Sequence, residues 1–430
     1  MNHMKNVTSD RVRPDHLLVR AGRKMRTAAR KPGFTWRWLQ DRFMTWVVGM
    51  PVALFARLVR PVVHLRFNVM DDTRIGVFAG CSSVYLTQKS IGRHKGFVDL
   101  MGTISQCDPI HESVPVNKPV YRLLNEKLHF RPWAGWASKA NDMLPGREAH
   151  TVPLYSMDED GSCIVQPPAV EVPADIMEVG DRWLADRGID KDTPVLLFAN
   201  RDQAYLEQFN PEKAWNYHDY RNSDIHAMLP MVNRFVEKGY GAVRFGAAAE
   251  QAIGDVGPKI IDLPFEERRE ELDIYLGWRC RFFISVSSGI GDLPRMFRRP
   301  VSFVNAAPFL TMASMRMKNL PSEIWIPKLY WSKKEKRLLT FSEIVACPAA
   351  DSYFSEEFHR AGIELVENTP DEISELALET EEILDGRQDL DKESRDLYDR
   401  FWSIYLQGKP WAGESRIALS FLRRHIDLLK

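Results

Sequence analysis

The sequence contains little cysteine, and none of it is patterned. Five cysteines occur in 430 residues without a CxxC pair: Cys81, Cys107, Cys163, Cys280 and Cys347. An odd, scattered set excludes a disulfide framework and gives no spacing for a zinc cluster. We therefore expect reduced, buried thiols in a cytosolic protein.

Further absences narrow the function. The chain has no internal repeats and no low-complexity tracts, which excludes a repeat architecture. No G-x-G-x-x-G follows an apolar strand-like run, which disfavours a dehydrogenase. The formal net charge is zero, and we expect no nucleic-acid partner.

Long hydrophobic runs are also scarce. The longest, roughly Phe43 to Ala56, is shorter than the about 18–20 residues of a spanning helix. No small-residue cleavage site follows it, so a secretory signal is not expected. Three tryptophans mark its near end and three arginines its far end: Trp36, Trp38, Trp46, Arg57, Arg60 and Arg66.

The charge is unevenly distributed. Residues 1–45 hold eleven Lys or Arg against three Asp or Glu, so an acidic body follows a basic head. Tryptophan favours the headgroup boundary, and arginine favours anionic lipid. We therefore expect residues 34–66 to bind an anionic membrane surface peripherally, on the cytoplasmic face of a bacterial inner membrane. The alternative is a helix pair packed on the protein's own body, with Pro51 and Pro61 as joints.

The pattern changes near residue 70 and predicts four parts. Residues 1–69 form the basic tail and amphipathic helices, 70–172 a first α/β domain, 173–350 a Rossmann-like domain, and 351–430 helices that pack back on the body. The first domain contains the helix "KPVYRLLNEKLHF" and an expected hairpin, "VPLYSMDEDGSCIVQPP", with an Asp-Gly turn.

The clearest pattern lies in residues 173–350. The runs "PVLLFAN", "YGAVRFG", "KIIDLP", "RFFISVS" and "PVSFVN" are apolar throughout and alternate with helical segments. Such strands predict a parallel sheet covered on both faces, the doubly wound α/β fold. Ser223 is expected to cap one helix, and Thr369 with Glu372 predicts a capping box for another.

In such a sheet, ligands bind beyond the carboxyl ends of the strands. Three strand ends carry notable residues: 200–202, 244–246 and 287–289. Amides at a helix start and serine hydroxyls suit a phosphate, and the forks of Arg201 and Arg244 match phosphate oxygens in pairs. The sequence therefore predicts a site for a diphosphate, most simply that of a nucleotide.

Each feature also has a plainer explanation. The Ser-Ser-Gly turn alone is typical of a helix cap, Arg201 alone of an ion pair with Asp202, and Arg244 alone of a contact to Asp262. Asp202 and Asp292 are expected to position an arginine or to accept from ribose hydroxyls. Arg221, in "YHDYRNSD", is either a second phosphate contact or a clamp on its own loop.

Several strings resemble those of a bacterial glycosyltransferase family from surface-polysaccharide clusters. They are Arg201-Asp202 with Tyr205, His218–Ile225 with Arg221 and Asn222, Gly239–Gly246, Ser287–Gly289 and Asn368–Ile373. The match spans roughly residues 70–430, and "DYRNSDI" is its most specific part. The arginine after the first strand of the Rossmann-like domain is more distantly similar to the arginine motif of protein O-fucosyltransferases.

This resemblance implies a GT-B fold, with two facing Rossmann-like domains and a nucleotide-sugar in the C-terminal one. It implies inverting transfer of a sugar to a cell-surface polysaccharide or glycolipid, without a metal or other cofactor. Arg201 would be the principal contact to the leaving diphosphate, helped by Arg244, Gly246 and the Ser287, Ser288 and Gly289 turn.

The remaining roles stay open. A general base for the acceptor is expected from the first domain, where Asp108, His111 and Glu112 are candidates and a plain surface loop is the alternative. A metal-dependent GT-A transferase could instead use "DED", Asp158 to Asp160, although a polar turn explains that string more simply.

The first domain also departs from the family pattern. "FAGCSSVYL" differs from the usual start of the domain, and "GTISQCDPI" lacks an expected asparagine. These departures favour a second function, a catalytically inactive membrane-associated scaffold of a polysaccharide or envelope assembly system.

Overall fold

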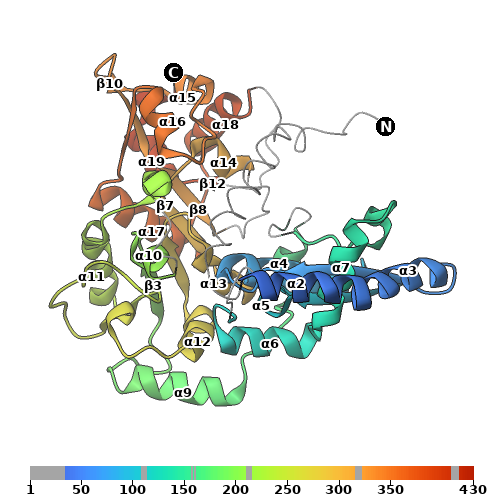
Figure 1. The fold of residues 1–430 in the computed structure, drawn as a ribbon. Helices are drawn as coiled ribbons and strands as arrows, with labels where there is room; N and C mark the ends of the chain where they lie inside the picture. The colour runs from blue at the N-terminus through green and yellow to red at the C-terminus, as the bar shows by residue number, and fades with distance from the viewer. Residues whose placement is uncertain are drawn as a thin grey trace. The chain divides into compact units, whose positions relative to one another are not determined.

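The computed structural model describes residues 34–107, 114–155, 158, 161–209, 216–314, 322–407 and 416–430. Many of its elements are labelled in Figure 1. The described chain divides into two compact units. The first comprises residues 34–73, Lys95–Val116 and Asn125–Pro153, and the second comprises Arg74–His94, Asn117–Leu124 and Leu154–Lys430.

These units differ from the predicted parts in one respect. Helix α4 (Ile75–Ser90) lies within the predicted 70–172 domain but belongs to the second compact unit. Its side chains explain why: the Arg298 guanidinium donates to Ser83 Oγ at 3.2 Å and to Thr87 Oγ1 at 2.8 Å. The helix is thus tied to a turn more than 200 residues further along the chain.

The first unit is built on a two-stranded parallel sheet. Strand β1 (His64–Met70) pairs with β2 (Phe97–Thr103). Arg66 in β1 donates two hydrogen bonds to Asp99 in β2, at 2.7 and 2.8 Å. Helix α7 (Pro132–Asp142) packs on this sheet, and the unit also contains α5 (Ile104–Cys107) and η2 (Arg147–His150). Its small core is formed by Ala56, Phe67 and Ala137.

One long helix begins the described chain. It consists of α2 (Phe34–Met44), the π-helical turn η1 (Thr45–Gly49) and α3 (Met50–Val59), which follow one another without a break. The predicted joint at Pro51 is therefore wrong. Proline lacks the N–H of a regular helical hydrogen bond, and here it follows a π-helical turn whose wider spacing shifts the hydrogen-bond pattern. The helix ends at Val59, just before Pro61.

The second unit contains the predicted parallel α/β sheet. Seven parallel strands run in the order β12-β8-β7-β6-β3-β4-β5. They are β3 (Val195–Ala199), β4 (Gly241–Arg244), β5 (Ile260–Asp262), β6 (Phe282–Ser285), β7 (Val301–Ala306), β8 (Ile324–Pro327) and β12 (Arg416–Ile417). Every residue of β3, β4, β6, β7 and β8 is buried. This confirms strands covered on both faces, whereas the facing-domain GT-B arrangement stays a prediction.

Helices lie on both faces of this sheet. From β3 the chain passes through α11 (Leu229–Glu237) to β4, toward the β5 edge of the sheet. From β5 it passes through α12 (Glu271–Arg279) to β6 and then through α13 (Asp292–Met296) to β7, toward the β12 edge. Because such crossovers are right-handed, the reversal places α11 on the opposite face from α12 and α13. The helix α9 (Ala174–Ala185) contacts α12, and α17 (Pro370–Leu384) contacts α11.

The C-terminal part returns to the sheet. Strand β12 pairs with β8, and α19 (Leu419–Arg424) packs on α17. The predicted capping box of α17 is confirmed: Thr369 accepts from the backbone of Glu372, whose side chain accepts from the backbone of Thr369. The remaining elements of this part are β9 (Leu329–Ser332), β10 (Arg337–Leu338), β11 (Ile363–Val366), α14 (Phe309–Ser314), α15 (Phe341–Ala346), α16 (Ser355–Arg360) and α18 (Lys392–Tyr405).

Two local predictions are wrong. The expected hairpin is replaced, in the described residues, by the short helix α8 (Ser162–Val165), because Asp158 accepts from Ser162 Oγ and from the Cys163 amide. The helical segment after the "YHDYRNS" string begins with η4 (Ile225–Met228), and its N-cap is Asp224 rather than Ser223. Asp224 accepts from the His226 amide at 2.9 Å.

Candidate functional site

The predicted meeting of three strand ends is confirmed. Strands β6, β3 and β4 are neighbours and parallel, so their carboxyl ends lie at one edge of the sheet. The direction of the chain reverses between β3 and β6, because β4 and β5 lie on one side of β3 and β6, β7 and β8 on the other. Such a switch point is where open α/β sheets bind their ligands.

Arg201 stands at this switch point, directly after β3. Its Nη1 donates to the His218 carbonyl at 3.0 Å and to Asn222 Oδ1 at 3.1 Å. Its Nε and Nη2 donate to none of the described residues, and no described carboxylate lies within ion-pair distance of it. Burial, reinforced by the charge of Arg221, lowers the pKa of Arg201 to about 10, so the group keeps its charge at neutral pH.

Arg221 approaches the same point from the 3-10 helix η3 (Asn216–Arg221). Its Nη2 donates to the carbonyl of Ser287, just beyond β6. Its Nε is buried and has no acceptor within the described ranges. Burial lowers the pKa of Arg221 as well. Arg221 therefore holds its own loop against the end of β6, which is one of its two expected roles. The other expected role, a phosphate contact, stays a prediction that the unpaired Nε would allow.

A third cation lies close to this pair. Lys328, just after β8, is 3% exposed and donates to the Asn222 carbonyl at 2.6 Å. Burial lowers its pKa, and the nearest described carboxylate is that of Glu367, at 3.6 Å. Asn222 thus accepts from Arg201 through its side chain and from Lys328 through its backbone. Two cations, Arg201 and Lys328, therefore donate to the same residue, Asn222.

Arg244, at the end of β4, is engaged differently from Arg201. It is 1% exposed, and its Nη1 donates to the Gln251 carbonyl at 2.6 Å and to Asp262 at 3.2 Å. Its Nη2 donates to Asn200 Oδ1 at 3.1 Å. The predicted phosphate contact by Arg244 is therefore replaced by the plainer one to Asp262, because internal acceptors already surround the guanidinium.

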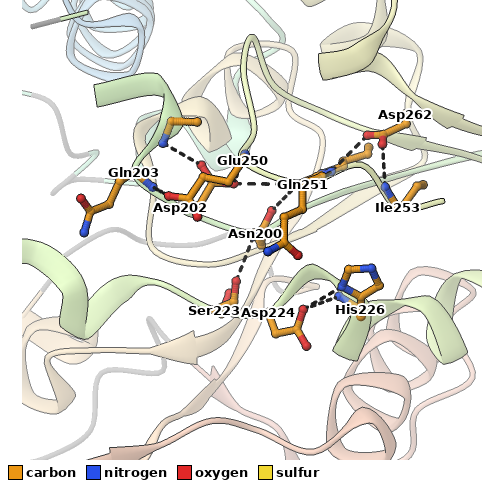
Figure 2. A network of polar contacts seen from close by, with 12 residues as sticks. Asn200, Asp202, Gln203, Ser223, Asp224, His226, Glu250, Gln251, Ile253 and Asp262 are labelled. Atoms are coloured by element: carbon orange, nitrogen blue, oxygen red, sulfur yellow. Dashed lines mark hydrogen bonds and ion pairs between the residues drawn. The ribbon is translucent and has the colours of Figure 1, made fainter. Parts of the chain in front are cut away.

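The carboxylates beside Arg244 organise a loop (Figure 2). Asp202 accepts from the amides of Ala204 and Glu250, at 3.1 and 3.0 Å. Asp262 accepts from the Ile253 amide at 2.9 Å, and Asn200 donates to the Ser223 carbonyl at 2.9 Å. These contacts hold residues 246–254 against β3 and β4. Asp202 also lies 3.9 Å from the Arg244 guanidinium, so its expected role of positioning an arginine has a partner in the structure, whereas the ribose contact stays a prediction.

The Ser287–Gly289 turn is closely covered by another backbone. A Cβ on Gly76, in the first turn of α4, would come within 2.5 Å of the Gly289 Cα. The helix that follows the turn, α13, has five residues. Ser288 precedes the short 3-10 helix η6 (Gly289–Gly291) and makes no side-chain cap. The predicted phosphate cradle is thus occupied on one side by α4.

The remaining predicted residues lie in other surroundings. Asp292 is 3.9 Å from the Arg295 guanidinium, and Arg295 pairs with Glu323 at 2.9 Å. Burial raises the pKa of Asp292 to about 7. Tyr205, in α10 (Ala204–Phe209), has its pKa raised by burial and by the nearby Asp273. Gly246 follows β4 with a φ of 156°.

Sequence reasoning missed a set of aromatic side chains beside the arginines. The rings of Tyr217 and Phe354 have centroids 6.0 Å apart. Ser355, the first residue of α16, accepts from the Tyr220 amide at 3.1 Å and donates to the Tyr217 carbonyl at 3.2 Å. Phe354 and Tyr353 are exposed. Because these residues lie about 135 positions from Tyr217 in the sequence, no local pattern could predict that they come together.

Other predicted residues carry no structural test. Asp108, His111 and Glu112 lie outside the described residues, as do Glu159 and Asp160. Asp158 is described, and its carboxylate accepts from Ser162 Oγ and from the Cys163 amide in α8. Within the described ranges, no group of three or more His, Cys, Asp or Glu side chains has the geometry to hold a metal ion.

Comparison with known proteins adds no assignment. The chain matches no protein-family model, no curated protein and no solved structure.

Proposed function

We propose that this chain is a glycosyltransferase that takes a sugar from a nucleotide-sugar and binds the diphosphate at Arg201 and Arg221. The observation that carries the proposal is a pair of partly buried guanidiniums at the switch point, without a carboxylate partner in the described residues. A buried cation that lacks an opposite charge is costly. A bound anion would supply that charge.

The free edges of the two forks suit a diphosphate. The Nε–Nη2 edge of Arg201 matches two phosphate oxygens, because a guanidinium binds such groups in a bidentate manner. Arg221 adds its unpaired Nε from the other side of the switch point. Arg201, with a pKa of about 10, remains charged at neutral pH when the diphosphate departs with growing negative charge.

This arrangement supports transfer without a metal ion. Fixed cations aimed at a developing charge lower the barrier to departure of the nucleoside diphosphate, and loss of one such donor typically costs about 10²–10³ in kcat. The exposed rings near Tyr217 offer apolar faces for the base. The acceptor is a surface polysaccharide or a glycolipid, and the transfer inverts the sugar carbon, as the family resemblance implies.

A thermal-shift panel with UDP, GDP, CDP and CMP tests the donor site. At least one nucleotide should raise the melting temperature of the full chain, since a ligand selective for the native state stabilises it. Arg201→Ala should abolish that shift. Arg182→Ala is the matched control, because Arg182 pairs with Glu178 on the exposed face of α9. Equal shifts in Arg201→Ala and wild type would refute the proposal.

A second proposed function, a non-catalytic scaffold, is favoured by the contact between Gly76 and Gly289, which covers the turn beyond β6. A scaffold that retains the arginine pair would bind a nucleoside diphosphate without turnover. Release of nucleoside diphosphate from a panel of nucleotide-sugars, measured with and without EDTA, separates the possibilities. EDTA-insensitive release supports the metal-independent enzyme, and binding without release supports the scaffold.

A further inference from the structure

The long helix α2–η1–α3 carries a row of large apolar side chains on one face that the first unit does not cover. Exposed residues recur at intervals of three, four or eight positions: Leu39, Phe43, Trp46, Leu54 and Leu58. Such intervals place side chains along one side of a helix. Leu58 is 78% exposed and Trp46 is 56% exposed, so the described residues leave both parts of the row uncovered.

The opposite side of the helix is held by the protein itself. Thr45, Gly49, Ala53 and Ala56 are buried, and η1 and α3 pack on α7. A Cβ on Gly49 would collide with the Trp136 carbonyl, so the two helix backbones are in direct contact there.

Polar contacts fix the same side at both ends. Asp41 accepts from Lys139 at 2.7 Å, and Arg57 donates to Asn141 Oδ1 at 2.9 Å. The helix therefore has one face bound to protein and one face without protein contact in the described part of the first unit.

We propose that this apolar face inserts into the surface of an anionic bilayer, with the helix lying in the membrane plane. Trp38–Val59 has, by length and composition alone, enough apolar residues to cross a membrane, with a mean hydropathy of 1.4 and 22% of it buried. A spanning helix would have to leave α7 and expose Thr45 and the Asp41–Lys139 pair to hydrocarbon. Lying in the plane retains every one of these contacts.

The charges select the occupant. From Arg42 to Arg60 the chain has no Asp or Glu, whereas it has Arg42, Arg57 and Arg60. Residues 1–33 add nine Lys or Arg against two Asp. Two copies of this chain joined through the face would bring like charges together, which is unfavourable. Anionic headgroups instead attract each basic residue near the surface.

The experiment is sedimentation of the full chain with vesicles of phosphatidylcholine, alone or mixed with phosphatidylglycerol. We expect binding to the mixed vesicles, several-fold weaker binding to phosphatidylcholine alone, and release by high salt and by alkaline carbonate. Trp46→Glu and Leu58→Glu should each lower the partition coefficient about tenfold or more, because each replaces a buried apolar contact by a charge.

Val165→Glu is the matched control, because Val165 is an equally exposed apolar residue in α8. Retained melting temperatures in the glutamate variants would show that they fold. The proposal is overturned by absent binding to mixed vesicles, by equal binding of all variants, or by carbonate-resistant insertion, which would indicate a spanning helix. It is also overturned by a dimer in solution that Leu58→Glu dissociates. The outcome is independent of nucleotide binding and thus of the proposed glycosyl transfer.

Discussion

The arginines at the ends of β3 and β4 differ in one respect that decides their roles. Arg244 is enclosed by Asp262, Asn200 and the Gln251 carbonyl, so its charge is matched inside the protein. Arg201 has a carbonyl and an amide oxygen as partners, and a second cation as neighbour. Neighbouring strand ends thus carry the same residue type in two states: the charge of Arg244 is matched by Asp262, whereas Arg201 has no carboxylate partner among the described residues.

Replacing Arg244 should have the largest effect on stability. Arg244→Met would leave Asp262 and the Gln251 carbonyl without their buried donor, and breaking such a pair from one side costs roughly 3–5 kcal/mol. Urea unfolding measures the loss. A variant as stable as wild type would mean that the two arginines do not differ as described.

Gly76→Ala should cause the next largest loss in the free energy of unfolding. The added Cβ would come within 2.5 Å of the Gly289 backbone, and overpacking of this kind costs about 1–3 kcal/mol. The same denaturant series measures it, with Gly257→Ala as control, because a Cβ at Gly257 meets nothing within 4 Å. Equal unfolding midpoints would contradict the close cover of the turn beyond β6.

Asp292 is a buried carboxyl group, and its protonation should make the stability of the protein depend on pH. Burial raises the pKa of Asp292 to about 7, above the about 3.9 of an unfolded aspartate. Its protonated form is therefore favoured by folding, and that stability is lost as the pH rises from about 4 through 7. Asp292→Asn should stay neutral at all pH values and therefore be more stable than wild type at pH 8, with a difference that shrinks as the pH falls toward 4. Melting temperatures measured from pH 4 to 8 test this. A constant difference between variant and wild type over that range would contradict it.

Arg201→Met should have the smallest effect on stability. Removing a partly buried cation without a carboxylate partner leaves no opposite charge unpaired, so the free energy of unfolding should change by less than about 1 kcal/mol or increase slightly. Nucleotide binding should nevertheless be lost. A strongly destabilised variant would indicate that Arg201 is structural, like Arg244.

The sequence predicted the sheet well, because its strands are apolar throughout and buried on both faces. The run "PVLLFAN" became β3, and the edge on which Arg201, Arg244 and Ser287 converge follows from strand parallelism. What the sequence could not give was the partner of each arginine. The partners of Arg244, Gln251 and Asp262, lie within 18 residues of it in the sequence. The sequence nevertheless gives no sign that Arg244 has a carboxylate partner and that Arg201 has none among the described residues.

Contacts across long separations were also beyond reach. The aromatic neighbour of Tyr217 comes from Phe354, and the cover of the Gly289 turn comes from Gly76. The expected hairpin failed for a local reason, since the Asp158 carboxylate accepts from the Cys163 amide and a short helix follows in place of a second strand. In each case, tertiary packing or capping overrode a pattern that was ambiguous in sequence.

Titration calorimetry of the full chain with inorganic pyrophosphate tests the central claim most directly. If the guanidiniums of Arg201 and Arg221 form the anion site, wild type should bind pyrophosphate, and Arg201→Met and Arg221→Met should each weaken binding at least about tenfold. Arg182→Ala should bind like wild type. Unchanged affinity in both arginine variants, or no binding by wild type at low salt, would contradict the account.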